Sequence, residues 1–290
     1  MIEQGSQNHG SFHLAGVIPI AGQPLDFNFP WHDSLMPVGK EYLALERAVA
    51  ECAMAGCETI WIVCHKETQP LVRERIGEWV YDPVSLSRGP LPSEEEKQIP
   101  IFYVPVHPKD RDRRDCLGWS VLYGALSAYH ISRQLSKWVI PDKYYVSFPY
   151  GVYPVESLRE HRKMISSSEP FSLTHEGKSI KSGEYLGFTF DAEDFKRCRT
   201  ALRKNSTARK DAQGNTLSLE KRYSARHFPL DIVFKHVIME EEKMAHLPWY
   251  FRVDSWDSYS RYLGAEQTVE KPERMKYNEW NPIGHDGESL

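Results

Sequence analysis

The segment from Val17 to Val63 constrains the fold of this chain more than any other. It reads VIPIAGQPLDFNFPWHDSLMPVGKEYLALERAVAECAMAGCETIWIV: an apolar run, a proline-containing loop, a stretch with apolar residues at helical spacing, and a second apolar run. Gly56 after the helical stretch supplies a stop, because glycine readily adopts the left-handed conformation that ends many helices. The run TIWIVC is almost continuously apolar, as is typical of a parallel strand buried on both faces. Strand, helix and strand in this order predict the opening of a βαβ unit.

The same alternation continues along the chain. Further strands are expected at 99–106, 143–148 and 249–253, and helices at 67–80, 117–135, 155–165, 191–204, 228–243 and 255–266. Residues 109–116 form a charged loop, and residues 171–190 form antiparallel strands that turn at Glu176-Gly177. The pattern predicts an α/β fold with a doubly wound, mainly parallel sheet and a small antiparallel excursion. We expect a flexible arm over 1–13, one domain over 14–265 and a polar tail over 266–290.

Composition excludes several classes of protein. The chain has 290 residues, 41% of them hydrophobic and 26% charged, as in an ordinary globular protein. Its formal net charge of −4 gives no general attraction to nucleic acid or to anionic membranes. No apolar run reaches the ~20 residues of a membrane span, and the polar N-terminus does not resemble a signal peptide. The five cysteines lack metal-ligand spacing, so we expect buried reduced thiols and a cytoplasmic location.

Five short matches, in the right order, resemble the sugar-1-phosphate nucleotidyltransferases. VIPIAG is similar to the family's first strand, and LMPVGKEYLALERAVAECAMAGCETIWIV to its proline–valine turn, long helix, Ala-Gly stop and second strand. LGWSVLYGAL resembles the helix whose start contacts the nucleobase. KYYVSFPYGVYPVESLREH and FPLDIVFKHVIMEEEKMAHLPWYFRVDSWDSYSRYLG are similar to a later strand–helix unit and to the closing segment. The resemblance implies a GT-A-like, Rossmann-related fold with a nucleotide or nucleotide-sugar as its partner.

The resemblance also implies site residues. It places the nucleotide at the loop after the first strand and at the start of the base-binding helix, on Ala21, Gly22, Gln23, Gly118 and Ser120. Asp254 matches the second of the family's two metal aspartates, so Mg²⁺ would be the cofactor of an active enzyme.

The family's remaining catalytic side chains have no counterparts at the matching positions. The family's loop carries Gly-x-Gly-Thr-Arg and later Pro-Lys, whereas Gly22 is followed here by Gln-Pro-Leu, and His32-Asp33 stand at the Pro-Lys position. The first metal aspartate should fall near Tyr150-Gly151, where no acid is available. Removing one preorganised electrostatic contact costs on the order of 10²–10³ in rate. We therefore expect a degenerate catalytic site.

Two groups of residues offer substitutes. Arginine presents a planar fork of donors that suits phosphate, so we consider as a phosphate clamp Lys40, Arg111, Arg113 and Arg114. The alternative for the three arginines is a self-neutralised surface loop, because aspartates alternate with them. His32-Asp33 and His65 follow strands that end at the same sheet edge. If their side chains meet there, they form an acid–base pair or a metal site; if they do not, they are part of a solvated loop.

Three functions stay open at this point. An active nucleotidyl- or glycosyl-transferase needs substitute cations and a metal, and a non-catalytic relative binds a nucleotide without turnover. A structural protein uses the fold for assembly. We expect the dense aromatic residues near the C-terminus to pack under the sheet, and the alternative is an interface with a protein partner or in a homo-oligomer. The loop from Ala21 to Asp33 discriminates between these three functions. If its Phe27, Phe29 and Trp31 fill the cleft, no room is left for a nucleotide, and both the active transferase and the nucleotide-binding relative are disfavoured.

Overall fold

The computed structural model describes residues 12–22, 25, 27, 29–84, 97–136, 139–205, 210, 213–216, 218 and 228–272, without the side chains of residues 112, 113 and 205. Most of the expected arm and tail therefore lies outside the described residues. Parts of both pack on the domain. The main-chain N–H of His13 donates to Asp142 Oδ2 at 2.8 Å, and the side chain of Val269 is buried.

A central sheet carries the fold. Its strands are β1 (Leu14–Pro19), β4 (Thr59–Cys64), β5 (Trp79–Tyr81), β6 (Gln98–Pro105), β7 (Lys143–Val146), β9 (Ser172–Thr174), β10 (Phe188–Phe190) and β11 (Met244–His246). They lie in the order β11-β9-β10-β7-β1-β4-β6-β5. The four strands β7, β1, β4 and β6 are parallel, whereas β5 and β10 pair antiparallel with β6 and β7. The predicted fold class, a mainly parallel sheet with an antiparallel excursion, is confirmed.

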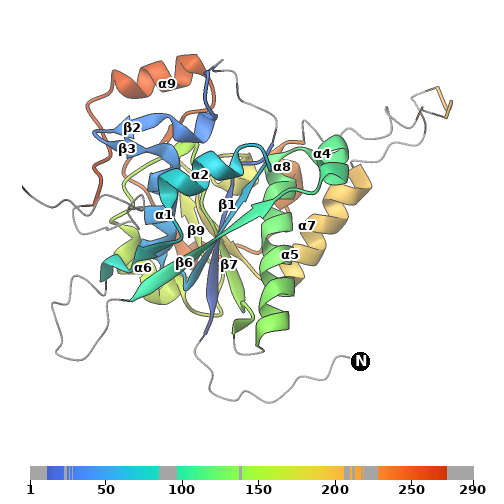
Figure 1. The fold of residues 1–290 in the computed structure, drawn as a ribbon, viewed down its shortest axis with the longest axis horizontal. Coiled ribbons are helices and arrows are strands. Elements are labelled where there is room, and N and C mark those ends of the chain that lie inside the picture. The colour runs from blue at the N-terminus through green and yellow to red at the C-terminus, as the bar shows by residue number, and fades with distance from the viewer. Residues whose placement is uncertain are drawn as a thin grey trace, which may run out of the picture.

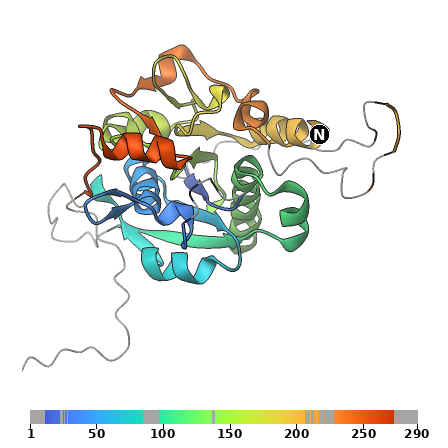
Figure 2. The same cartoon turned by 90° about the horizontal axis from the view of Figure 1, so that it is seen from above.

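Helices cover both faces of this sheet (Figures 1 and 2). One face carries α1 (Ala44–Ala55), α2 (Gln69–Ile76) and α6 (Leu158–Ile165); the other carries α5 (Leu117–Leu135), α7 (Ala192–Asn205) and α8 (Leu230–Phe234). At one end, α9 (Trp256–Leu263) packs on the hairpin of β2 (Pro37–Gly39) and β3 (Tyr42–Leu43), and its Tyr259 and Tyr262 hydroxyls donate to main-chain carbonyls of β2. β8 (Gly151–Val152) pairs with β12 (Phe251–Arg252), and single 3₁₀ turns form η1 (Asp33–Leu35), η3 (Ile180–Ser182) and η6 (Glu241–Lys243).

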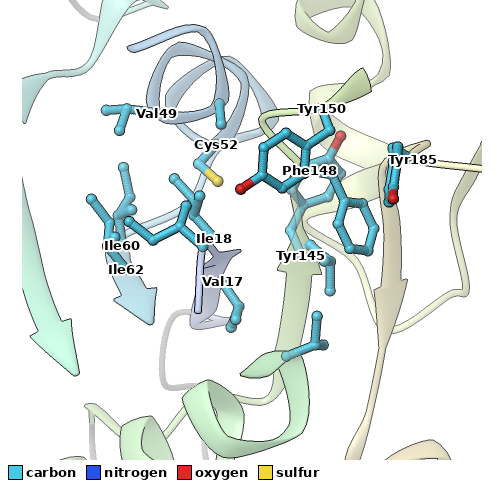
Figure 3. Close-up of a cluster of buried hydrophobic side chains, with 14 of the residues drawn as sticks. Val17, Ile18, Val49, Cys52, Ile60, Ile62, Tyr145, Phe148, Tyr150 and Tyr185 are labelled. Carbon is cyan, nitrogen blue, oxygen red and sulfur yellow. The ribbon is translucent and has the colours of Figure 1, made fainter. Parts of the chain in front are cut away.

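The hydrophobic core lies between α1 and the parallel strands (Figure 3). Ile18 of β1 and Ile60 and Ile62 of β4 are buried on the side of Val49 and Cys52 of α1. Val17, on the opposite face of β1, lies against α5. Gly16 permits the approach of α1, because an added Cβ would lie 2.8 Å from Cys52 Sγ. Each fully buried aliphatic side chain contributes about 1.5–3 kcal/mol. All five cysteines are buried and free, as expected.

One cluster of charged and polar side chains is buried inside this core. Glu51 on α1 lies 3.0 Å from Arg47 Nη1 and accepts hydrogen bonds from Tyr145, Ser147 and Tyr153 at 2.5–2.6 Å. Both members of the ion pair are fully buried. These three hydroxyls and the guanidinium satisfy the carboxylate and so make its burial tolerable.

Three predicted elements differ from the structure. The charged run at 109–116 was expected as a loop, but residues 108–114 form the helix α4 (Pro108–Arg114), with Pro108 in its first turn and His107 as N-cap. The helix expected at 67–80 ends at Ile76, since Gly77 has a positive φ of 86° and β5 follows. The helix expected at 228–243 ends at Phe234, and the chain continues through η6 into β11. None of the described helices has both the length and the apolar character needed to cross a membrane.

Candidate functional site

The loop after β1 and the start of α5 meet at the carboxyl edge of the parallel strands. Ile20 and Ala21 both donate main-chain hydrogen bonds to the carbonyl of Val63, at 2.9 and 2.8 Å, which fixes the loop beside β4. The Ser120 hydroxyl donates to the carbonyl of Ala21 at 2.6 Å and is buried. The structure thus brings together two of the predicted nucleotide-binding residues, and an internal hydrogen bond already occupies the Ser120 hydroxyl. Gln23 lies outside the described residues.

The first turn of α5 packs tightly on its neighbours. An added Cβ at Gly118 would lie 2.9 Å from Val233 Cγ2, so this glycine serves close packing against α8. An added Cβ at Gly22 would lie 3.4 Å from the side chain and main chain of Leu117, so the β1 loop also touches α5. Both predicted glycines therefore have a structural reason to be glycine.

Trp119 is the most unusual side chain at this edge. Only 4% of its surface is exposed, yet its indole Nε1–H has no hydrogen-bond partner among the described residues. The guanidinium of Arg114 lies 4.6 Å from the centre of its ring, a cation–π contact. A buried donor without an acceptor costs about 1–3 kcal/mol, so a ligand carbonyl or ring nitrogen at this position would gain a preformed donor.

The four clamp candidates do not form one cluster in the part of the chain that the structure describes. Lys40 is exposed in the turn between β2 and β3, at a distance from α4 along the sheet edge (Figure 1). Arg111 lies on α4, and its Nη1 is 2.7 Å from Glu67 Oε1. Arg114 lies one turn later on the same helix, against Trp119, and the Arg113 side chain lies outside the described residues. Among the described side chains of α4, Arg114 is the cation that contacts the predicted base-contacting turn, and its Nη1 also lies 4.0 Å from Asp110 Oδ1.

His32 and His65 lie near the same edge of the sheet, where the charge of His65 acts on His32. His65 Nε2 lies 2.9 Å from Asp115 Oδ1, and both side chains are largely buried. His32 Nδ1 accepts from the main-chain N–H of Ser34 at 3.2 Å and faces its hydroxyl at 2.8 Å. Since Nδ1 is the acceptor, the proton of the neutral ring lies on Nε2. Burial, reinforced by the charge of His65, lowers the pKa of His32 to about 4.

These contacts define what the histidine pair can do chemically. The Nδ1 atom of His32 is engaged by Ser34, so this side chain caps the η1 turn. Asp33 does not join the pair, because its Oδ2 accepts the main-chain N–H of Leu25 at 2.8 Å. Burial raises the pKa of Asp33. Asp115 orients the ring of His65. No cluster of three or more metal-ligating side chains occurs among the described residues.

The aromatic loop residues pack against α9. Phe27 and Phe29 stack with ring centres 4.9 Å apart, and Phe29 and Trp31 stack at 5.3 Å. Tyr259 meets the edges of both phenylalanine rings at 6.1 and 6.3 Å. Phe27 is buried, whereas 48% of Trp31 remains exposed. The loop thus forms a ladder of rings that runs from the core to the surface beside α9.

Solved structures show what this arrangement resembles. A protein from Bacillus anthracis, assigned as a glucose-1-phosphate thymidylyltransferase and solved in complex with a sucrose, superposes with a TM-score of 0.51. It is 11% identical, and the match covers 89% of this chain and 98% of that one. The chain has the nucleotidyltransferase fold. A UTP-bound UGPase from Acinetobacter baumannii gives a TM-score of 0.49 at 14% identity over 87% of this chain and 92% of that one. No family model and no curated protein sequence matches.

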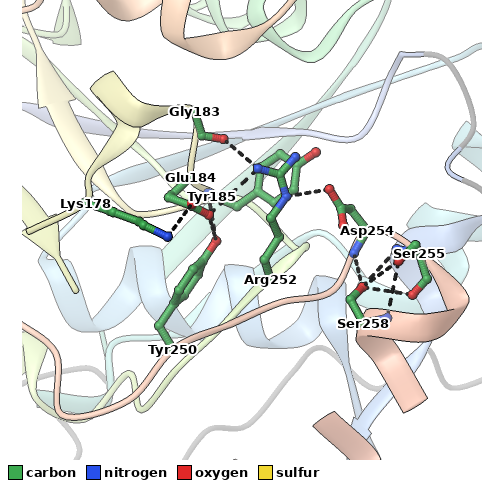
Figure 4. A network of polar contacts seen from close by, with 9 residues as sticks. All are labelled: Lys178, Gly183, Glu184, Tyr185, Tyr250, Arg252, Asp254, Ser255 and Ser258. Carbon is green, nitrogen blue, oxygen red and sulfur yellow. Dashed lines mark hydrogen bonds and ion pairs between the residues drawn. The ribbon is translucent and has the colours of Figure 1, made fainter. Parts of the chain in front are cut away.

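Within the nucleotidyltransferase fold, the predicted metal aspartate is engaged by an arginine (Figure 4). Asp254 Oδ2 lies 2.5 Å from Arg252 Nε, and its main-chain N–H donates to Ser258. Arg252 also lies 4.7 Å from the ring centre of Tyr185 and 3.8 Å from Glu184. A metal at Asp254 would have to compete with this guanidinium for the carboxylate.

Sequence reasoning missed two partners at this site. Asp115 was counted with the charged run, although it stands just before α5 and so at the same edge as His65. Arg252 was not considered as a partner of Asp254, although these oppositely charged residues are separated only by Val253 at the end of the predicted strand. In both cases, the position of the residue relative to the neighbouring predicted elements could have identified the pair.

Proposed function

We propose that this protein binds a nucleotide or a nucleotide-sugar through its nucleotidyltransferase fold and does not turn it over as a pyrophosphorylase does. The observation that carries the proposal is the unpartnered, buried indole N–H of Trp119 in the first turn of α5. This is the turn that, by resemblance, contacts the base. A base carbonyl or ring nitrogen would accept that hydrogen bond, and the guanidinium of Arg114 would neutralise phosphate charge nearby.

The engagement of the other polar groups supports the absence of turnover. Arg111 is paired with Glu67 and Asp254 with Arg252. Each pair would have to break before its charge could act on a triphosphate or on Mg²⁺. Phosphoryl transfer depends on preorganised cations, so groups that must first be released contribute little to the rate. We place the protein in the cytoplasm, in keeping with its five free cysteines.

Thermal unfolding tests the proposal against nucleoside triphosphates, nucleotide-sugars and sugar phosphates, each with and without Mg²⁺. A ligand at 100 times its Kd stabilises the native state by about 2.7 kcal/mol and raises the unfolding midpoint by degrees. Trp119→Phe keeps an aromatic ring and removes the donor, so it should weaken binding two- to tenfold, roughly the effect of one hydrogen bond. Trp79→Phe, at the far edge of the sheet on β5, is the matched control and should leave binding unchanged.

Each other outcome points to a different function. Release of pyrophosphate in the presence of Mg²⁺ would identify an active transferase with a rearranged site and overturn the proposal. A midpoint that no compound shifts would favour the assembly function. That second candidate has its own support, because Trp31, Trp256 and Leu263 are 48%, 56% and 58% exposed at and beside α9.

A further inference from the structure

A hollow between η3 and α8 lies apart from the Trp119 site and combines charges that the proposed function does not use. Its volume is about 380 Å³, and it is lined by Lys181, Asp231, Ile232, Lys235 and His236. Small-molecule sites in proteins range from about 300 to 1,000 Å³, so this hollow suits a ligand at the small end of that range.

The hollow has a firm frame because α8 is anchored from its other side. Val233 packs against Gly118 of α5, and apolar side chains along this face of the segment are buried: Leu230, Val233, Phe234 and Val237. The opposite face carries the lining residues. Gly183 ends η3 with a positive φ of 81° and brings this turn close to Asp231. A Cβ added at Gly183 would lie 3.7 Å from the Cβ of Asp231. The lysine of η3 therefore faces the two basic residues that follow α8.

The charges of the hollow are not balanced internally. Among the described residues, the side chains of Lys181, Lys235 and His236 make no ion pair, although the neighbouring Lys178 and Arg252 both lie within 4.0 Å of Glu184. One carboxylate, Asp231, faces two ammonium groups. A local excess of positive charge on a chain with a net charge of −4 indicates a binding surface for an anion.

We infer that this hollow binds a small phosphate monoester whose carbon skeleton carries a hydroxyl group. The ammonium groups of Lys181 and Lys235 would bind the phosphate oxygens, as compact point charges do. The Asp231 carboxylate would accept a hydrogen bond from the hydroxyl, and the exposed side of Ile232 would contact the carbon skeleton. The carboxylate explains why an ester with a hydroxyl, rather than phosphate alone, is the better ligand.

Isothermal titration of the full chain with glycerol 3-phosphate and with inorganic phosphate tests the inference. We expect saturable one-to-one binding of glycerol 3-phosphate that weakens as salt rises, because the contacts are charged and half-exposed. The double variant Lys181→Gln/Lys235→Gln should weaken it about tenfold or more. The matched control is Lys178→Gln/Lys196→Gln, which changes the net charge equally at exposed lysines outside the hollow. Equal losses in both double variants, or no saturable binding by the wild type, would overturn the inference.

A second variant tests the part assigned to the carboxylate. Asp231→Asn removes a negative charge and keeps the size, so inorganic phosphate should bind as well as before or more tightly. The preference for glycerol 3-phosphate over phosphate should shrink, and an unchanged preference would refute the assignment. Nucleotide-induced stabilisation should survive the Lys181/Lys235 double variant, because that site lies at Trp119. Failure of the proposed function and failure of this inference are therefore distinguishable.

Discussion

Protonation of His32 should destabilise the protein in a defined pH window. Burial and the neighbouring His65 lower the pKa of His32 from 6.5 to about 4. In the unfolded chain the ring titrates near 6.5, so the unfolded state binds this proton more tightly than the native state does. The stabilisation from a neutral His32 is therefore complete above about pH 6.5 and is lost as pH falls toward 4. This shift corresponds to about 3 kcal/mol of unfolding free energy.

Urea unfolding of wild type and His32→Asn at several pH values between 4 and 7.5 measures this contribution. Asparagine is a good N-cap and keeps an acceptor for the Ser34 N–H, but it does not titrate. Carboxylates that titrate in the same range are common to both proteins, so they cancel in the difference. We expect the stability difference to be constant above pH 7 and to change by about 3 kcal/mol by pH 4.

A difference that stays constant across the whole range would refute this account of His32. So would an NMR titration in which the His32 ring protonates near pH 6.5. Either result would mean that the ring is not held neutral beside Ser34, and that the η1 turn is capped in another way.

Two further perturbations test the packing around the site. Glu51→Gln should lower the free energy of unfolding by about 3–5 kcal/mol, because it leaves Arg47 buried with a neutral partner. Chemical denaturation measures this loss, and a value below about 1 kcal/mol would show that water reaches the cluster. Gly124→Ala should lower the free energy of unfolding by about 1–3 kcal/mol, since the new Cβ would lie 2.7 Å from Val63 Cγ2 and 2.8 Å from Val17 Cγ1. An unchanged unfolding midpoint would mean that α5 moves freely over β1 and β4.

The parallel centre of the fold could be predicted because its signals are local and strong. The run Thr59–Cys64 is apolar at nearly every position, and the helix before it ends at a glycine, so strand and helix follow from the sequence alone. The edge strand β5 could not be predicted in the same way. Its three residues, Trp79–Tyr81, continue a helical pattern, and they become a strand only because β6 offers an open edge on which to pair.

The contacts of the polar residues at the site could not be predicted from local sequence alone, because the fold around each residue decides which partners its side chain meets. Arg47 and Glu51 lie at i and i+4 on α1, a spacing typical of an exposed helix face, but both are buried, and their partners come from β7 and the residues after it. In the same way, Asp254 matches a metal ligand by position, and the arginine two residues earlier converts it into one half of an ion pair. Resemblance therefore predicts which edge of the sheet carries the site, but only the contacts show which polar groups remain available. The indole of Trp119 is such a group: the resemblance places it in the base-contacting turn, and its missing hydrogen-bond partner is visible only in the structure.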